Sequence, residues 1–378
     1  MRICIFGRAN YEQLKSRTEQ LAVHDLDIHI LSLQAGQMDH ATVHQIPRLP
    51  LVGGLSYLSL PIAARNLIRR LQPSVIDVHS VSSYGAYCFA PVAGIPVVAT
   101  VYGSDVTAHA ARSRIGRMIA TKCLNKADLV YASSPIAEAD IRRVLNVDLQ
   151  DRFTSHSWGI EMSHVNALSS EDRASERSKR GFPADAVIAV HNRQFCDFWR
   201  IDQVQSLAKK FCQQTDNGYF VFVCPPADAL AAQKIELAQR SVADAGLSDR
   251  IRFEQSLPHD QMLRLFNAAD IFTCFGDADL LSSSLLEAMA LGMIPIVRDL
   301  PAYREVISDQ KNGYVHAELD EPTVLRNFLH VANHCQTHLE NMGKSNRKLI
   351  ATMYDAIECS RWMAKRYEQL AEHGAEKT

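Results

Sequence analysis

Two carboxylates in the second half of the chain, Asp279 and Glu287, are separated by seven residues, three of which are serines. The apolar residues that follow predict a short helix over 283–291, closed by Gly292. The beginning of a helix offers backbone N–H groups without intrahelical partners and the positive end of the helix dipole, and both favour a phosphate. Carboxylates at that position can accept sugar hydroxyls. The stretch therefore predicts a site for a sugar attached to a diphosphate.

Two other interpretations of these residues stay open. Ser284 and Glu287 have the spacing of a capping box, in which the glutamate returns to the backbone N–H of the serine that begins the helix. Asp277, Ala278 and Asp279 form a D-x-D pattern, with which many sugar transferases of another fold hold a divalent metal. Because no further acid or histidine stands close in sequence and a positive helix end follows directly, we expect no metal here.

The elements that must position these motifs follow an alternating α/β pattern. Short apolar runs alternate with amphipathic stretches of helical period, which predicts parallel sheets covered on both faces. The expected strands are 3–6, 28–33, 75–79, 96–101 and 129–133 in the first half, and 187–191, 219–224, 251–254, 271–274 and 294–297 in the second. The expected fold is two facing Rossmann-like, doubly wound domains, with a cleft at the carboxyl ends of their strands.

A polar segment divides the chain of 378 residues, a length that agrees with about two domains. The segment is rich in Ser, Glu, Arg and Lys and predicts a hinge or linker over 161–182. An N-terminal domain over 1–160 precedes it, and a C-terminal domain over 183–354 follows. A last helix is expected after a further polar stretch.

The bulk composition excludes several classes of protein. The net charge of -2 provides no global field for nucleic acid. The 9 cysteines form no CxxC pair, so we expect buried thiols in a reducing compartment. The first residues predict a strand rather than a signal peptide, and no apolar run approaches the roughly 18 residues that cross a bilayer. We expect a cytoplasmic protein that at most touches a membrane surface.

One long segment and several short ones carry a resemblance to a known family. Residues 268–297 combine an acid, seven residues and a glutamate with an apolar helix, a glycine and a strand, and the similarity continues through 303–315. The segment closely resembles the retaining glycosyltransferases of family 4, which have the GT-B fold. Weaker similarities follow in the order of the family at 77–79, 103–106, 131–134, 158–161 and 246–253. The resemblance therefore covers most of the chain.

The resemblance implies a hexosyltransferase that moves a sugar from a UDP- or GDP-sugar to an acceptor hydroxyl, with retention of configuration, in polysaccharide or glycolipid assembly. The C-terminal domain would bind the donor. The N-terminal domain, with a C-terminal crossover helix over 355–378 packed on it, would bind a glycan or a lipid-linked acceptor. No cofactor and no metal would be required, since fixed positive groups can stabilise the leaving diphosphate.

The family's functional residues fall on named positions of this chain. Glu287 would bind the ribose, Asp279 the donor sugar, and the backbone N–H groups around 281–284 the distal phosphate. Arg193 would neutralise the diphosphate, since a guanidinium matches phosphate oxygens through paired N–H groups. The implied catalytic residues are Asp279, Arg193 and Asp105; the implied donor-binding residues are Glu287, Leu281, Ser282, Ser283, Ser284 and Arg200; the implied acceptor-side residues are Tyr102, Gly103, Ser104 and His109.

Departures from the family pattern fall in loops that would contact substrate. Asp279 stands where the family has glutamate and is one methylene shorter. Tyr102 stands where the family has histidine, for which His109 is a nearby substitute. These departures leave two alternatives open. One is a nucleotide-sugar epimerase on the same fold, and the other is a catalytically inactive GT-B-like binding or scaffold protein.

Other departures surround the expected phosphate site. The family's lysine after Arg193 has no clear counterpart, and Arg200 is its candidate substitute across the unusual segment 195–199. The loop at 7–10 lacks the family's paired glycines, and the loop at 224–226 lacks its glycine-rich turn. The sequence thus keeps the family's pattern in the strands and helices and departs from it in the loops expected to contact substrate.

A basic segment over 112–126 carries five Arg or Lys residues and no acid, interleaved with apolar residues. A basic amphipathic helix can lie on an anionic membrane surface, where it would meet a lipid-linked acceptor at the inner leaflet. The alternative is an ordinary amphipathic helix with a solvated basic face. Arg65, Arg69 and Arg70 would extend the same basic surface.

Overall fold

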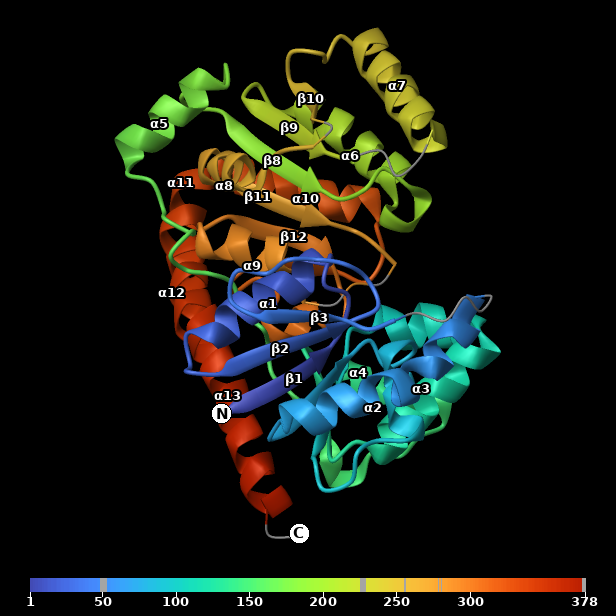
Figure 1. Cartoon of the computed structure of the whole chain (residues 1–378). Coiled ribbons are helices and arrows are strands. Elements are labelled where there is room, and N and C mark those ends of the chain that lie inside the picture. The colour runs from blue at the N-terminus through green and yellow to red at the C-terminus, as the bar shows by residue number, and fades with distance from the viewer. Residues whose placement is uncertain (48–52, 225–228, 255, 278, 280, 376–378) are drawn as a thin grey trace. The chain divides into compact units, whose positions relative to one another are not determined.

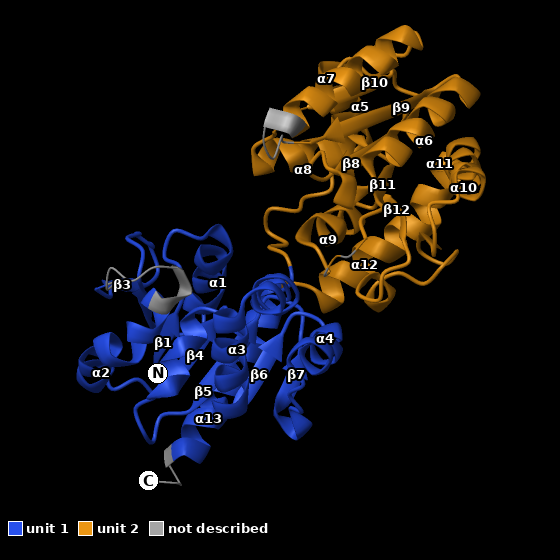
Figure 2. Cartoon of the chain, turned by 90° about the vertical axis from the view of Figure 1, so that its right-hand side faces the viewer, with its two compact units in different colours: residues 1–159, 356–378 blue, residues 160–355 orange. Residues whose placement is uncertain are grey.

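The computed structural model describes residues 1–47, 53–224, 229–254, 256–277, 279 and 281–375. The chain forms two compact units, shown in Figures 1 and 2: unit 1 comprises residues 1–159 and 356–378, and unit 2 comprises residues 160–355. None of the described helices is both long and apolar enough to cross a membrane. The expected loop at Pro225 and Pro226 and the central residue of the D-x-D pattern, Ala278, lie outside the described residues.

Unit 1 is built on a parallel sheet whose described strands have the order β3-β2-β1-β4-β5-β6-β7. β1 pairs with both β2 and β4, so the order of the strands reverses at this place. β4 and β5 are buried along their whole length, as expected where helices cover both faces. The strands are β1 (Arg2–Phe6), β2 (Asp27–Ser32), β3 (Thr42–Gln45), β4 (Val75–His79), β5 (Val97–Val101), β6 (Leu129–Ala132) and β7 (Phe153–Ser155).

The helices of unit 1 come from both ends of the chain. They are α1 (Glu12–Ala22), α2 (Leu60–Leu71), α3 (Arg114–Lys126), α4 (Ile136–Leu145) and α13 (Ala356–Ala375), with short 3₁₀ turns and a π-helical segment over Asp105–Ala110. α13 packs on α1 and β4. Its Met363 and Tyr367 are buried among the apolar side chains of β1 and β2, and the Tyr367 hydroxyl donates to Asp77 on β4. The last helix is therefore part of the core of unit 1.

Unit 2 has a parallel sheet with the described order β10-β9-β8-β11-β12-β13. The strands are β8 (Val187–Asn192), β9 (Gly218–Val223), β10 (Ile251–Glu254), β11 (Ile271–Cys274), β12 (Ile294–Arg298) and β13 (Tyr314–His316). The helices are α5 (Ser170–Lys179), α6 (Ile201–Gln214), α7 (Ala229–Asp244), α8 (His259–Ala268), α9 (Ser283–Ala290), α10 (Glu321–Asn333), α11 (Cys335–His338) and α12 (Lys344–Met353). β8 pairs with β9 on one side and β11 on the other, so the strand order reverses between β8 and β11.

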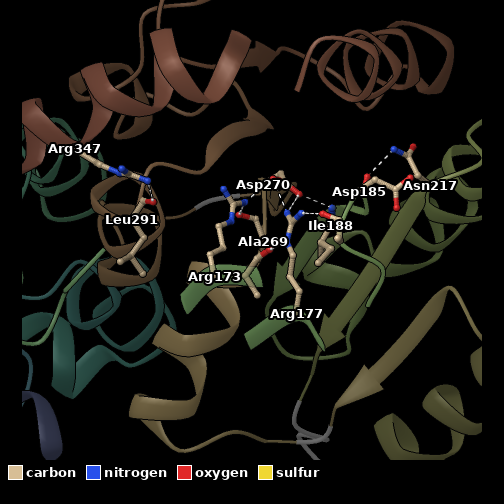
Figure 3. Close-up of polar contacts among 11 residues, drawn as sticks. Arg173, Arg177, Asp185, Ile188, Asn217, Ala269, Asp270, Leu291 and Arg347 are labelled. Atoms are coloured by element: carbon tan, nitrogen blue, oxygen red, sulfur yellow. Dashed lines mark hydrogen bonds and ion pairs between the residues drawn. The ribbon is translucent and has the colours of Figure 1, made fainter. Parts of the chain in front are cut away.

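A buried ion-pair network fixes α5 to this sheet (Figure 3). Asp270, only 1% exposed, accepts hydrogen bonds from Arg177 at 2.8 and 2.9 Å and from Arg173 at 2.6 Å. The backbone N–H of Ile188 on β8 donates to the same carboxylate at 2.8 Å. A carboxylate so far from water is tolerated because four hydrogen bonds from three donor groups replace its hydration. The polar segment expected as a hinge thus contains a helix that is anchored within unit 2.

The expected α/β fold with two doubly wound parallel sheets is confirmed. All ten expected strands occur, and three further strands, β3, β7 and β13, were not predicted. These strands have three or four residues, and β3 and β7 are only partly buried, so they carry no apolar run. The basic helix begins at Arg114, two residues later than expected, because the Ser113 hydroxyl caps it by accepting the N–H of Gly116.

Candidate active site

The residues expected at the diphosphate meet where the strand order of unit 2 reverses. Arg193 follows directly after β8, and Asp279 lies on the loop after β11. β8 ends at Asn192 and β11 begins at Ile271, with 78 residues of chain between them. The two strands are nevertheless neighbours in the sheet. The carboxyl ends of strands beside such a reversal form the crevice in which doubly wound sheets bind ligands. The fold therefore brings the two expected residues to the place where a ligand is expected.

Arg193 is the centre of this cluster. Its Nη2 donates to Asp279 Oδ2 at 2.9 Å and to Ser282 Oγ at 2.8 Å, and its Nη1 donates to the carbonyl of Asn192 at 2.7 Å. The side chain is 9% exposed, and burial alone would lower its pKa. The neighbouring Cys274, Tyr303 and Asp279 nevertheless raise the pKa of Arg193 above its ordinary value. The guanidinium is thus held as a fixed cation beside the start of α9.

Asp279 has a second partner that the sequence did not reveal. The buried hydroxyl of Tyr303 donates to Asp279 Oδ2 at 2.6 Å and lies 3.2 Å from Cys274 Sγ. Burial raises the pKa of Tyr303 well above its ordinary value, so this hydroxyl keeps its proton. Tyr303 lies in the segment that carries the family resemblance, but nothing in its spacing identifies it as a partner of Asp279. The carboxylate is therefore fixed by two donors on one oxygen.

The capping-box interpretation of Ser284 and Glu287 is wrong. Ser282 is the N-cap of α9, and its hydroxyl accepts the N–H of Leu285. The helix begins two residues earlier than a box at Ser284 requires, because Ser282 is the residue with extended backbone angles. Glu287 lies one turn further along, where a capping role is out of reach. Its carboxylate accepts instead from His259 Nε2 at 2.8 Å.

The first acid of the D-x-D pattern is paired as well. Asp277 Oδ1 accepts from Arg200 Nε at 2.8 Å and also from Arg298 at the end of β12. These hydrogen bonds lower the pKa of Asp277, with Arg200 as the largest cause. Arg298 was missed by the sequence analysis, since an arginine at a strand end has no distinctive spacing. Both aspartates thus face guanidinium groups, and no group of three His, Cys, Asp or Glu residues in the described part of the chain could hold a metal ion.

The unusual segment 195–199 packs against the same loop. The ring of Trp199 lies 5.0 Å from the Arg193 guanidinium carbon, and the backbone N–H of Asp277 donates to the carbonyl of Phe198. Gly276 is required here, because a Cβ would lie 2.3 Å from a Trp199 ring atom. The indole therefore supports both the arginine and the loop that carries the two aspartates.

The other expected donor residues lie along the same loop and helix start. Leu281 and Ser284 are partly buried, and Ser283 is exposed. Ser284 Oγ accepts from Asn192 Nδ2 at 3.4 Å. His191, at the end of β8, is fully buried, and burial lowers its pKa to about 3, so the imidazole is neutral. Neutral polar groups and the Arg193–Asp279 ion pair thus lie around the start of α9.

In unit 1, Asp105 lies at the carboxyl end of the sheet as a buried anchor. It is 2% exposed, and its two oxygens accept the backbone N–H groups of Val81 at 3.0 Å and Tyr102 at 3.1 Å. Burial raises the pKa of Asp105 to about 6. The carboxylate thus joins the loops after β4 and β5, and its expected part in acceptor binding stays a prediction.

The remaining acceptor-side residues occupy the loop after β5 and the π-helical segment. The Tyr102 hydroxyl and His79 Nδ1 are hydrogen-bonded at 2.7 Å, and His79 Nε2 lies 3.2 Å from Asp77 Oδ2. Gly103 has a φ of +80°, which suits glycine alone. Ser104 and His109 are exposed. Tyr102 is thus tied to a buried histidine and aspartate, which the sequence analysis did not place beside it.

Comparisons with known proteins bear on the family and the fold of the chain. A family model described as "Glycosyl transferase 4-like" matches residues 2–134, and one described as "Glycosyl transferases group 1" matches residues 172–349. The GDP-mannose:cellobiosyl-diphosphopolyprenol alpha-mannosyltransferase of Xanthomonas oryzae pv. oryzae is 27% identical over 77 residues, which are 20% of this chain and 20% of the relative. The match thus spans about a fifth of the length of the curated relatives.

Solved structures are similar over nearly the whole chain. The Anabaena protein HepE in complex with UDP has a TM-score of 0.81 at 14% identity, with 98% of this chain and 100% of that chain covered. Sucrose-phosphate synthase from Thermosynechococcus elongatus has a TM-score of 0.77 at 15% identity, with 98% and 99% covered. Both similarities concern the fold. With the two family models, they identify the chain as a member of the group 1 glycosyltransferases with the GT-B fold.

Proposed function

We propose that the protein transfers a sugar from a UDP- or GDP-sugar to an acceptor hydroxyl, with retention of anomeric configuration and without a metal. The observation that carries the proposal is the contact of Arg193 with both Asp279 and Ser282, the N-cap of α9. It puts a fixed cation beside a helix start at the strand reversal of unit 2. This combination of charge and free N–H groups suits a diphosphate.

The donor's parts have separate partners in this proposal. The backbone N–H groups at residues 281–284 and Arg193 bind the diphosphate, and Asp279 accepts hydroxyls of the sugar through the oxygen that Tyr303 and Arg193 leave free. Glu287 accepts the ribose hydroxyls. Negative charge builds on the diphosphate as it leaves, so donors that are already fixed toward it stabilise the transition state. The departing phosphate takes the proton of the acceptor hydroxyl on the same face of the sugar.

The proposed absence of a metal rests on the partners of the two aspartates. Asp277 bonds Arg200 and Arg298, and Asp279 bonds Arg193. A divalent ion bound to either carboxylate would lie beside these guanidinium groups, whose positive charge repels it. Arg193 and Arg200 carry the positive charge that a metal supplies elsewhere. Added EDTA should therefore leave the transfer rate unchanged, and a lost rate restored by Mg²⁺ or Mn²⁺ would contradict this part of the proposal.

For the acceptor, unit 1 offers Asp105, Tyr102 and Gly103, with the exposed Ser104 and His109, at the carboxyl ends of its strands. The Xanthomonas relative is named for a diphosphopolyprenol acceptor, and this supports a lipid-linked glycan among the candidates. Polysaccharide or glycolipid assembly follows as the proposed process. The donor base stays open between uridine, as in the HepE complex, and guanosine, as in the relative's name.

A peripheral membrane contact is proposed for the face around α3. A surface hollow of about 670 Å³ is lined by Arg112, Arg114, Arg117 and Lys122, together with the exposed Phe89 and Met118. Cations around exposed apolar groups suit an anionic bilayer surface. The double variant Arg114→Glu/Arg117→Glu should lose sedimentation with anionic vesicles that the parent shows. Equal sedimentation of both proteins would contradict the contact.

The test of the donor assignment is a thermal-shift screen with UDP-, GDP- and ADP-sugars. A ligand that binds only the folded state raises the melting temperature. We expect one nucleotide class to do so, Glu287→Ala to abolish the shift, and the exposed control Glu318→Ala to retain it. Transfer and anomeric configuration are then followed by NMR with lipid-linked and soluble glycans.

The alternatives predict different outcomes of the same experiments. An epimerase converts the nucleotide-sugar to its epimer without any acceptor, whereas a transferase requires one. An inactive binding or scaffold protein neither shifts with a nucleotide-sugar nor turns it over. Inversion of configuration in the product would contradict the retaining mechanism but leave the transferase function.

A further inference from the structure

Glu287 is held by a histidine from the neighbouring helix. The residue is 9% exposed, and its Oε1 accepts from His259 Nε2 at 2.8 Å. His259 is the first residue of α8, which packs against α9 and so brings the imidazole over Glu287. Because Ser282 caps α9, the carboxylate of Glu287 does not cap the helix. The His259 contact is therefore what fixes its orientation.

We propose that His259 is a positioning residue that holds the Glu287 carboxylate ready to accept the ribose hydroxyls of the donor. The proposal rests on the proposed function, since it requires a nucleotide at Glu287. A carboxylate offers about four acceptor positions. The imidazole takes one on Oε1, so positions on both oxygens stay available for two vicinal hydroxyls. Without the imidazole, the carboxylate can rotate and loses affinity for the pair.

The charges around His259 make the contact dependent on pH. Glu287 is the one charged residue of α9, and Asp260 on α8 and Glu161 before α5 are the further acids that act on the imidazole. From the end of α5, Arg180 donates to the carbonyl of Gln261 on α8. The hydrogen bond to Glu287 is the largest cause that raises the pKa of His259 above 6.5. A protonated imidazole is the stronger donor, so the orientation weakens as pH rises through this pKa.

A purely structural role, in which the pair only joins α8 to α9, makes a different prediction. It lowers the melting temperature when His259 is replaced, but it affects every nucleotide equally. A role through the ribose affects only nucleotides that carry the hydroxyls. UDP and its 2′,3′-dideoxy analogue separate the two roles, with GDP and its dideoxy analogue used instead if the donor screen selects guanosine.

The experiment compares the parent with His259→Phe, His259→Gln and the control His40→Phe, an exposed histidine of unit 1. We expect His259→Phe to weaken UDP binding about tenfold, and His259→Gln, whose amide still donates, to stay within about twofold. Neither change should alter binding of the dideoxy analogue. The fall in UDP affinity of the parent between about pH 6 and 9 should be absent in His259→Gln.

Three results would overturn the proposal. If His259→Phe binds UDP as well as the parent while Glu287→Ala does not, the positioning role fails and the donor site stands. Equal weakening of UDP and the dideoxy analogue would assign His259 a structural role only. If neither the parent nor any variant binds a nucleotide, the proposed function fails together with this inference.

Discussion

The Tyr303 hydroxyl donates to Asp279 Oδ2 at 2.6 Å, on the same oxygen that accepts from Arg193 at 2.9 Å. Asp279 is one methylene shorter than glutamate, and the phenol and the guanidinium together fix it on the loop before α9. The contact joins the loop after β11 to the short 3₁₀ turn after β12, which spans Tyr303–Glu305. An aspartate held in this way has one oxygen, Oδ1, left for a further donor, which in the proposed function is a hydroxyl of the donor sugar.

Tyr303→Phe should loosen Asp279 and lower affinity for the donor sugar. The variant removes one hydrogen bond to a charged group, for which we expect a loss of about 1.5–3 kcal/mol in the free energy of unfolding. Affinity for the nucleotide-sugar should fall more than affinity for the nucleoside diphosphate alone, which titration calorimetry measures. Tyr314→Phe on the edge strand β13 is the matched control. An equal loss of affinity for the nucleotide-sugar and for the nucleoside diphosphate would show that Tyr303 has no part in binding the sugar.

Arg193→Lys should abolish most of the transfer although it keeps the charge. A lysine ammonium cannot hold Asp279, Ser282 and the carbonyl of Asn192 in one planar arrangement. We expect kcat to fall by about 10²-fold, the scale found when one fixed donor to a developing charge is lost. Arg304→Lys, in an exposed pair with Asp299, is the control and should change kcat little. A rate close to that of the parent in Arg193→Lys would contradict the assigned role.

Ser282→Ala should cost both stability and donor binding, whereas Ser283→Ala should cost neither. Ser282 caps α9 and accepts from Arg193, while Ser283 is exposed. Loss of an N-cap side chain destabilises by about 1 kcal/mol. Chemical denaturation and nucleotide titration of the pair test this prediction. Equal stability and equal nucleotide affinity in the two variants would contradict the roles of Ser282 as N-cap and as partner of Arg193.

Asp270→Asn should be the most destabilising of these changes. The Asp270 carboxylate accepts hydrogen bonds from Arg173, Arg177 and the backbone N–H of Ile188. An amide has only one oxygen and no charge, so it cannot accept all of these bonds. Breaking a buried ion pair by removing one partner typically costs about 3–5 kcal/mol. Asp148→Asn, whose side chain is exposed and pairs with Arg142, should cost at most about 1 kcal/mol. Similar unfolding midpoints for the two variants would show that α5 is not anchored by this network.

The effect of Asp105 on stability should depend on pH. Burial raises its pKa from 3.8 to about 6 in the folded chain, so the folded state holds the proton more tightly than the unfolded state. The stabilising contribution is therefore full below about pH 4 and is lost as pH rises to 6, by about 3 kcal/mol. Relative to Asp105→Asn, which does not titrate, the parent should lose stability over this range. Parallel stability curves for the two proteins would contradict the raised pKa.

Much of the candidate donor site rests on local signals in the sequence, and its role in donor binding stays a prediction. The acid, the seven residues and Glu287 lie within one loop and one helix, and the apolar run predicts that helix directly. The position of its first turn could not be predicted, since Ser282, Ser283 and Ser284 are chemically identical N-cap candidates. In the structure, Ser282 is distinguished by its extended backbone angles and by the N–H of Leu285 that its hydroxyl accepts.

The partners of these residues were decided by the tertiary structure alone. Tyr303, Arg298 and His259 come from other loops and helices, and their positions follow from how strands β8, β11 and β12 lie side by side and from how α8 packs on α9. A sequence lists such residues at wide spacings without any periodic signal. The alternation of apolar runs thus determined the two doubly wound sheets and the edge at which a ligand is expected. The packing of the sheets and helices, driven by burial of apolar surface, decided which side chains meet there.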